Sequence, residues 1–230
     1  GYGLRMSRFA PSPTKRTRRS PITAGLAVLA AAALTLVPVA CGDDADTASE
    51  PALAGVVRDP ALEVGSVQLT SSDGSTVSMK ADPGELLIAT FGYTFCPDIC
   101  PTTLNDLSIV VNDLPDDLSD RVSVAFVTVD PERDTPEVLS SYVEAFFTDR
   151  GLGLHGADEA QLAQATEAFG VQFQIDDHEP GSINYSVAHT AVTYVIDERG
   201  SVIVEWPFGT EIDDMTSDLT TLLRSTDAAS

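Results

Sequence analysis

The feature that most constrains the fold is a continuous, largely apolar run over residues 86–91, Leu-Leu-Ile-Ala-Thr-Phe. Such a run is typical of a strand at the centre of a sheet that is covered on both faces. Apolar residues then recur at helical spacing over residues 102–114, which predicts an amphipathic helix. A second apolar run over residues 122–129 predicts another buried strand. Strand, helix and strand in this order predict a parallel βαβ unit.

The segments on either side of this unit extend the predicted sheet. Two alternating segments, 66–70 and 76–80, flank the turn Ser72-Asp73-Gly74 and predict an N-terminal hairpin. Thr135 and Pro136 are typical of a helix N-cap and a first helical position. The later predicted elements are helices over 135–147, 158–169 and 211–223 and strands over 171–173, 191–196 and 202–204. The predicted fold class is α/β: a thioredoxin-like fold with an extra N-terminal β-hairpin and an insertion before the last strands.

The N-terminal 40 residues have the layout of a secretory signal. They hold six Lys and Arg and no acid, and lead into an apolar run over residues 24–37 that is too short to span a bilayer comfortably. Small residues then meet Cys41, as in bacterial lipoprotein signals. This predicts a signal peptide over residues 1–40 and a lipidated Cys41. Pro38 departs from the usual leucine, so cleavage without lipidation and an uncleaved anchor remain as alternatives.

A tether and one domain are predicted after the signal. Residues 42–58 are mostly Asp, Ala, Ser, Glu, Pro and Gly without periodic apolar content, which is typical of disorder. We therefore predict a disordered tether over residues 41–62 and a folded domain over residues 63–225. A flexible chain of that length reaches about 25 Å. The expected location is the extracytoplasmic face of the cell membrane, with the domain held near the bilayer by its lipid anchor.

The charge of the chain limits its partners. Its 13 Lys and Arg and 35 Asp and Glu give a net charge of −22, and removal of residues 1–40 leaves seven basic and 35 acidic residues, or −28. Such a surface repels nucleic acid and anionic lipid headgroups and favours cationic partners or metal ions. Acidity that serves only solubility is the alternative for most of these carboxylates.

Two cysteines lie where the central strand meets the first helix. Cys96 and Cys100 are each followed by a proline, which disfavours helical angles in the residue before it, so both are predicted on a loop. The nearby helix N-terminus is expected to favour the thiolate over the thiol. An inert disulfide is the alternative, although so small a ring has little loop entropy to remove. The spacing is one residue longer than a Cys-x-x-Cys redox motif and leaves two sulfurs more room to hold a metal.

A histidine is the expected third ligand of a metal at these cysteines. Thiolates are soft ligands that select Cu(I), zinc or iron–sulfur clusters, and two sulfurs need a further ligand. His189 comes directly before a predicted strand, where a thioredoxin-like fold returns beside the cysteine loop. His155 in a Gly-rich turn and His178 in a polar stretch are more typical of solvated loop histidines. The predicted metal ligands are therefore Cys96, Cys100 and His189.

Three separated blocks of the sequence resemble the Sco (SenC) family. They are Phe91-Gly92-Tyr93-Thr94-Phe95-Cys96-Pro97-Asp98-Ile99-Cys100-Pro101, Val129-Asp130-Pro131-Glu132-Arg133-Asp134-Thr135-Pro136 and Val187-Ala188-His189-Thr190. The resemblance implies a thioredoxin-like fold that binds copper, as Cu(I) or Cu(II), through the two cysteines and His189. It also implies a copper donor and the copper-site subunit of cytochrome c oxidase as partners. An acid often precedes the histidine in this family, whereas Ala188 stands here, so another group must orient the imidazole or it is held more weakly.

The functions that remain open use the same residues differently. A copper metallochaperone for oxidase assembly needs all three ligands. A thiol–disulfide reductase acting on the oxidase subunit or another exported protein needs only Cys96 and Cys100 as a redox pair. A peroxidase-like or redox-sensing thiol enzyme is a weaker third candidate, so enzymatic activity stays open. The block over residues 130–136 is expected to scaffold the site, with direct partner contact as the alternative.

Overall fold

The computed structural model describes residues 52–229. The predicted signal peptide, the lipidated Cys41 and the first part of the predicted tether lie outside the described residues. Within residues 52–229, no helix is both long enough and apolar enough to cross a lipid bilayer.

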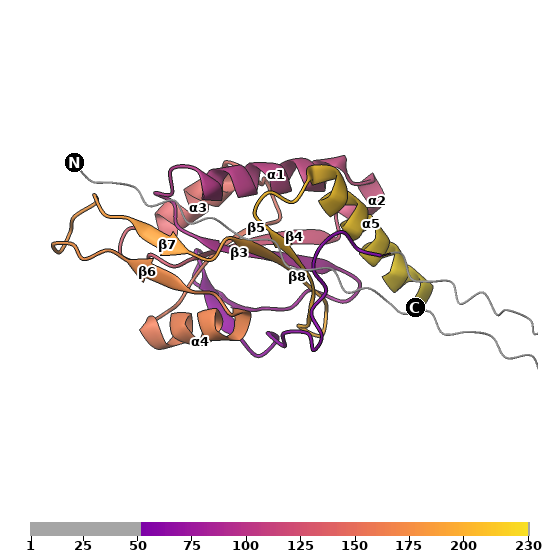
Figure 1. The fold of residues 1–230 in the computed structure, drawn as a ribbon, viewed down its shortest axis with the longest axis horizontal. Coiled ribbons are helices and arrows are strands. Elements are labelled where there is room, and N and C mark those ends of the chain that lie inside the picture. The colour runs from indigo at the N-terminus through magenta and orange to yellow at the C-terminus, as the bar shows by residue number, and fades with distance from the viewer. Residues whose placement is uncertain (1–51, 230) are drawn as a thin grey trace, which may run out of the picture. The chain divides into compact units, whose positions relative to one another are not determined.

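The domain is built on a seven-stranded mixed sheet with the strand order β2-β1-β5-β4-β3-β8-β9 (Figure 1). The strands are β1 (Gln68–Ser71), β2 (Thr76–Ser78), β3 (Leu86–Gly92), β4 (Val122–Thr128), β5 (Gly151–His155), β8 (Val192–Ile196) and β9 (Val202–Pro207). β3, β4 and β5 are parallel, β8 runs antiparallel to β3, and β9 runs antiparallel to β8 and so in the same direction as β3. Every residue of β3 is buried, as its continuous apolar run predicts.

Helices cover both faces of this sheet. They are α1 (Ile99–Asp113), α2 (Asp116–Ser119), α3 (Pro136–Glu144), α4 (Glu159–Phe169) and α5 (Ile212–Ala229). Figure 1 shows α1, α3 and α5 on one side of the sheet and α4 on the other. The predicted helix start at Thr135 is confirmed, because its hydroxyl accepts a hydrogen bond from Val138 N and Pro136 is the first helical residue. The arrangement is a thioredoxin-like α/β fold with an N-terminal hairpin, as predicted.

The strand β5 was not predicted, since its two glycines are more typical of a turn. α3 and the residues after it lie directly on this strand. A Cβ at Gly151 would lie 2.5 Å from Val143 Cγ1, and one at Gly153 would lie 3.2 Å from Leu139 Cβ. The glycines therefore serve close helix–strand packing instead of chain reversal.

The insertion before the last strands is a separate two-stranded sheet. It consists of β6 (Phe173–Ile175) and β7 (Val187–His189), with Phe173 opposite His189. β6 lies two residues later than the strand predicted at 171–173. The insertion itself is confirmed, and it carries the predicted histidine ligand on a strand of its own.

Residues 53–58 are packed against the domain, although they belong to the predicted tether. The amides of Ala54 and Gly55 donate to the carboxylate of Asp218 at 2.8 and 2.9 Å. The backbone of Val56 pairs with that of Glu205 in an isolated antiparallel β-bridge. A Cβ at Gly55 would lie 2.4 Å from Val204 Cγ2, so this segment lies close against β9. The disorder predicted up to residue 62 is therefore contradicted over residues 53–58, because backbone amides of this segment bond to a buried carboxylate that the sequence alone does not place.

Candidate metal centre

Cys96, Cys100 and His189 meet at the carboxyl end of β3. Their three potential ligand atoms all lie within 4.8 Å of one another, and Cys100 Sγ is 3.4 Å from His189 Nε2. Among residues 52–229 this is the one group of at least three Cys, His, Asp or Glu side chains placed to share a metal ion. Two sulfurs and one imidazole nitrogen are a donor set suited to a soft or borderline metal.

Cys96 is a half-buried thiol on the loop that connects β3 to α1. Its backbone amide donates to Tyr93 O at 3.2 Å, which folds the loop back on the end of the strand. Its sulfur accepts a hydrogen bond from Cys100 N at 3.3 Å. The first turn of the helix therefore already contacts the Cys96 sulfur through a backbone donor.

Cys100 lies in the first turn of α1 and not on the preceding loop, which corrects the position predicted from Pro101. A proline in the first turn of a helix costs little, because no intrahelical hydrogen bond is lost there. The Cys100 side chain is buried, and the residue is only 3% exposed. Burial raises the pKa of the Cys100 thiol strongly, and its hydrogen bond with Cys96 raises it further. The prediction of a thiolate here is therefore wrong for the metal-free protein. Loss of solvent around the buried sulfur disfavours the thiolate more than the helix N-terminus favours it.

Gly92 is a site residue that the sequence analysis did not single out. It ends β3, and a Cβ at this position would lie 2.7 Å from Cys100 Sγ and 2.9 Å from Phe126 Cε2. The sulfur therefore occupies space that any larger residue would fill. A glycine that ends an otherwise apolar strand just before two cysteines is the signal that could have identified it.

His189 is oriented by a backbone carbonyl. Its Nδ1 lies 3.0 Å from Thr190 O, a carbonyl that can only accept a hydrogen bond, so Nδ1–H donates to it and Nε2 is the ring nitrogen that faces Cys100 Sγ. The Tyr93 ring meets the imidazole edge-on, with centroids 6.0 Å apart and planes at 89°. These contacts orient the imidazole where Ala188 provides no acidic side chain.

The other two histidines lie away from this cluster. His155 Nδ1 is 3.0 Å from Gly156 O at the end of β5. His178 Nε2 is 3.6 Å from a Glu132 carboxylate oxygen, and its ring stacks on Tyr185 with centroids 3.7 Å apart. Both differ from His189 in having no cysteine beside them.

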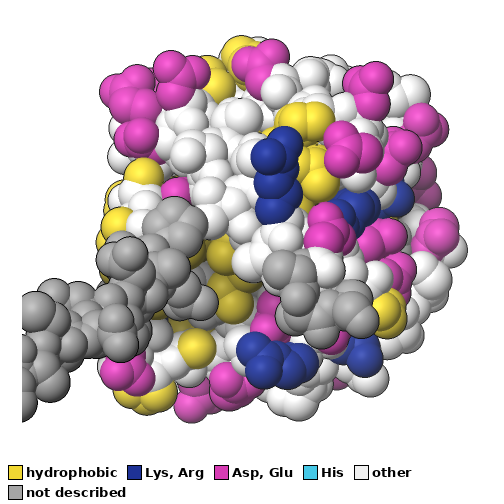
Figure 2. Space-filling model, turned by 90° about the vertical axis from the view of Figure 1, so that its right-hand side faces the viewer, with side chains coloured by type: hydrophobic (Ala, Val, Ile, Leu, Met, Phe, Trp, Pro, Cys, Tyr) yellow, Lys and Arg dark blue, Asp and Glu magenta, His cyan; other side chains and the backbone are white. Residues whose placement is uncertain are grey.

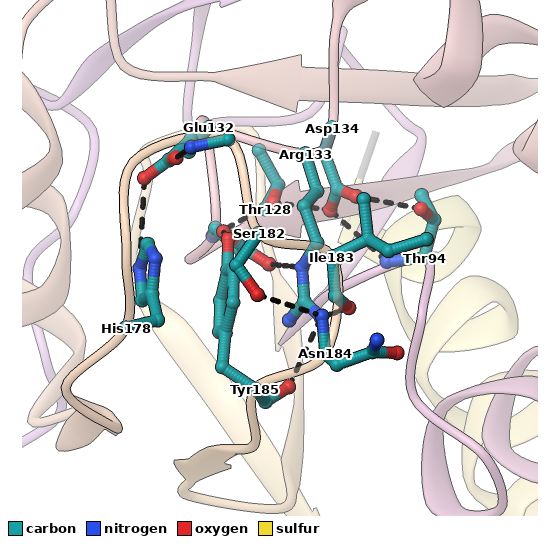
Figure 3. A network of polar contacts seen from close by, with 12 residues as sticks. Thr94, Thr128, Glu132, Arg133, Asp134, His178, Ser182, Ile183, Asn184 and Tyr185 are labelled. Carbon is teal, nitrogen blue, oxygen red and sulfur yellow. Dashed lines mark hydrogen bonds and ion pairs between the residues drawn. The ribbon is translucent and has the colours of Figure 1, made fainter.

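The turn that follows β4 supports the cysteine loop, as Figure 3 shows. The carboxylate of Asp134 accepts hydrogen bonds from Thr94 N at 3.0 Å, from Thr94 Oγ1 at 2.6 Å and from Thr128 Oγ1 at 2.6 Å. Burial raises the pKa of Asp134, while these hydrogen bonds oppose the shift. Thr94 stands two residues before Cys96, so this part of the 130–136 block has the scaffolding contacts that the sequence analysis expected.

The chain is similar in sequence and in fold to known proteins. The family model described as SCO1/SenC matches residues 57–224. An SCO2-like protein of Rickettsia prowazekii is 37% identical over 136 residues, which cover 59% of this chain and 65% of the relative's length. The copper-bound ScoI of Bradyrhizobium japonicum is 33% identical with a TM-score of 0.58, over 67% of this chain and 95% of the other. Apo Sco1 of Thermus thermophilus is 33% identical with a TM-score of 0.61, over 78% and 98%.

Proposed function

Because the chain belongs to the SCO1/SenC family, we propose that it binds copper and delivers it to, or primes, the copper centre of cytochrome c oxidase. The observation that carries this proposal is the meeting of two cysteine sulfurs and one histidine nitrogen within 4.8 Å. A solved relative at 33% identity is described with copper bound. The proposed copper ligands are Cys96 Sγ, Cys100 Sγ and His189 Nε2.

The chemistry of these ligands suits a copper ion that is carried and released. Thiolates bind Cu(I) well, and the imidazole also serves Cu(II). Binding must displace the proton of the buried Cys100 thiol, whose pKa is raised. Copper uptake is therefore expected to release protons and to weaken as the pH falls.

The test is copper uptake by the reduced protein beside two histidine variants. We expect wild type and His155→Ala to bind one copper ion each, because His155 lies away from the cysteines. We expect His189→Ala to bind copper at least tenfold more weakly, since one of three ligands is lost. Copper stoichiometry and competition with a chelator measure both. Failure of the wild type to bind copper, or equal binding by His189→Ala, would reject the proposal.

The delivery step is tested in cells that depend on this chain for oxidase assembly. Oxidase activity should fall in strains carrying Cys96→Ser or Cys100→Ser and remain in a strain carrying His155→Ala. Full oxidase activity in either serine variant would reject the role in assembly, whereas the proposal of copper binding is judged by the uptake experiment alone.

A second candidate function is reduction of a disulfide in the oxidase subunit or in another exported protein. It is favoured by two free cysteines joined by a hydrogen bond between Cys100 N and Cys96 Sγ. Exchange between thiols and disulfides needs the sulfurs and not the imidazole. Restoration of oxidase assembly by His189→Ala would favour this function over copper delivery.

We also propose that the chain is exported and held on the extracytoplasmic face of the membrane by lipid on Cys41. The support is the order of basic segment, apolar run and cysteine in residues 1–41. The expected result for Cys41→Ser is a chain that leaves the membrane fraction, and loss of lipid label from that variant is the matching readout. A variant that stays in the membrane would indicate the uncleaved anchor instead.

A further inference from the structure

The side chain of Arg133 is buried between the two parts of the chain that supply the metal site. Its side chain is 5% exposed and pairs through Nε with the fully buried carboxylate of Asp130. Its Nη1 donates to the backbone carbonyls of Ile183 at 3.1 Å and Tyr185 at 3.0 Å. These carbonyls lie in the segment just before β7, the strand that ends at His189. Together these contacts exclude water from the whole guanidinium, which is unusual for an arginine.

The ring of Tyr185 fastens the same segment. The Arg133 guanidinium carbon lies 3.6 Å from the Tyr185 ring centroid, and His178 stacks on this ring at 3.7 Å. Figure 3 shows the ring lying between the two. The Tyr185 hydroxyl donates to Asp130 at 2.7 Å, and His178 reaches the carboxylate of Glu132. Asp130, Glu132 and Arg133 all belong to the turn over residues 130–133.

The cysteine loop meets the same arginine from the other side. The Arg133 guanidinium carbon lies 5.3 Å from the ring centroid of Tyr93 and 5.1 Å from that of Phe95, within the range of cation–π attraction. Phe95 directly precedes Cys96. One buried side chain therefore touches both the loop that holds a cysteine and the segment that leads to the histidine.

The histidine strand needs such a tie because it is not part of the main sheet. Among the strands of residues 52–229, β6 and β7 pair only with each other, and an isolated two-stranded sheet is marginally stable. A small rotation of this sheet would move His189 Nε2 away from Cys100 Sγ, which it approaches to 3.4 Å. The distance between the sulfurs and the imidazole thus depends on contacts outside the ligands themselves.

We infer that Arg133 is a positioning residue that holds the β6–β7 sheet, and with it His189, against the cysteine loop. This inference rests on the proposed copper function. Arginine is required because its planar fork can pair with a carboxylate and reach two carbonyls together, whereas a lysine ammonium on a flexible stem does not reproduce this geometry. Arg133 touches no ligand atom in the structure and acts through the segment that it anchors.

The experiment compares Arg133→Lys with Arg121→Lys in the full chain. Arg121 is a matched control, because it also donates to a backbone carbonyl, that of Gly84, at 2.6 and 2.8 Å. Gly84 lies just before the start of β3, whereas the cysteine loop follows the end of this strand. The first readout is the rate of Cu(I) transfer from the loaded protein to the chelator bicinchoninate. We expect about a tenfold faster transfer from Arg133→Lys, the size typical of losing a group that orients a metal ligand, and a rate within twofold of wild type from Arg121→Lys.

The second readout is amide hydrogen exchange in the metal-free protein. The amides of Asp176 and Thr190, which donate to Ser186 O and Gln172 O at 3.0 and 2.9 Å, report on the β6–β7 sheet. The amide of Val129, which donates to Gly92 O at 2.9 Å, reports on the central sheet. Arg133→Lys should accelerate exchange at the first two and leave the third unchanged. General loss of stability would accelerate all three.

The outcomes test the positioning role of Arg133 separately from the proposed copper binding. Copper transfer at the wild-type rate from Arg133→Lys overturns the inference, whether or not exchange changes. Failure of the wild type to bind copper rejects the proposed function, and with it any role of Arg133 at a copper site.

If Arg133→Lys does not fold, Tyr185→Phe takes its place, since it loses only the hydroxyl bond to Asp130. That variant should transfer copper faster than wild type by a smaller factor, and an unchanged rate overturns the inference equally.

Discussion

At the residue scale, the candidate metal centre depends on side-chain size as much as on ligand chemistry. The sequence identified Cys96, Cys100 and His189 from their chemistry and their places beside predicted strands. It did not identify Gly92, whose missing side chain leaves room for the Cys100 sulfur. It also misjudged the ionisation of Cys100, because burial can be weighed against a helix dipole only when the depth of the side chain is known.

Substitution of Gly92 should disturb the sulfur directly. In Gly92→Ala, the new methyl group would lie 2.7 Å from Cys100 Sγ, so the sulfur or the Phe126 ring must shift. We expect a loss of about 1–3 kcal/mol in the free energy of unfolding, as for other overpacked core sites, together with weaker copper binding. Urea unfolding and copper competition measure the two effects.

The control for this prediction is Gly74→Ala in the β1–β2 hairpin. Gly74 has a φ of 86° and open space where a Cβ would lie. Its substitution strains the backbone and lowers stability by about 1 kcal/mol without reaching the cysteines. Equal copper affinity in Gly92→Ala and Gly74→Ala would contradict a steric role for Gly92.

At the element scale, periodic and capped segments were predictable and closely packed ones were not. α4 follows its predicted range to within one residue, because Asp158 caps it and Gly170 ends it in a left-handed conformation. β5 was missed because its glycines suit a turn equally well until the packing of α3 is known. The boundary of the domain was also placed too late, since residues 53–58 are fixed by a distant helix.

Asp218 is the group on α5 that holds this N-terminal segment. Its carboxylate accepts from Ala54 N, from Gly55 N and from Trp206 Nε1, the last at 2.9 Å. Asp218→Ala removes the partner of all three donors, and a buried donor such as Trp206 Nε1 that is left unpaired costs about 1–3 kcal/mol. We therefore expect a loss of at least about 2 kcal/mol in the free energy of unfolding, measured by urea denaturation, with copper binding unchanged.

Ser217→Ala on the exposed side of the same helix is the matched control. It should change stability by less than about 0.5 kcal/mol, as surface substitutions usually do. If Asp218→Ala were as stable as this control, the segment over residues 53–58 would contribute nothing to the domain.

At the scale of the whole molecule, charge and buried phenols set the response to pH. Figure 2 shows acidic side chains spread over one face of the domain with fewer basic ones among them, in keeping with a net charge of −22. Four of the five tyrosines have a raised pKa, with burial as the largest cause in each case: Tyr93, Tyr142, Tyr185 and Tyr194. The metal-free protein should therefore lose stability in alkali.

Tyr194 allows the sign of this effect to be tested. Burial raises the pKa of Tyr194 from 10.0 to about 12. Between these values the unfolded chain has lost a proton that the folded chain keeps, so the free energy of unfolding falls as the pH rises, by up to about 1.4 kcal/mol per pH unit for this group. Tyr194→Phe should give a shallower fall between pH 10 and 12 in urea unfolding of the reduced, metal-free protein.

A core variant on the same strand separates this slope from a simple loss of stability. Val195 is fully buried, and Val195→Ala should lower the free energy of unfolding at every pH without changing its slope. A slope for Tyr194→Phe equal to that of wild type would show that this phenol does not contribute.

The sequence by itself determined the order of the main elements, the insertion and the three candidate ligands. These follow from local features: apolar periodicity, caps, and the chemistry of cysteine and histidine beside predicted strands. The tertiary structure alone decided the depth of Cys100, the need for glycine at position 92, the strand β5, the docking of residues 53–58 and the contacts of Arg133. Each of these depends on atoms far apart in the chain, whose distances no local pattern encodes.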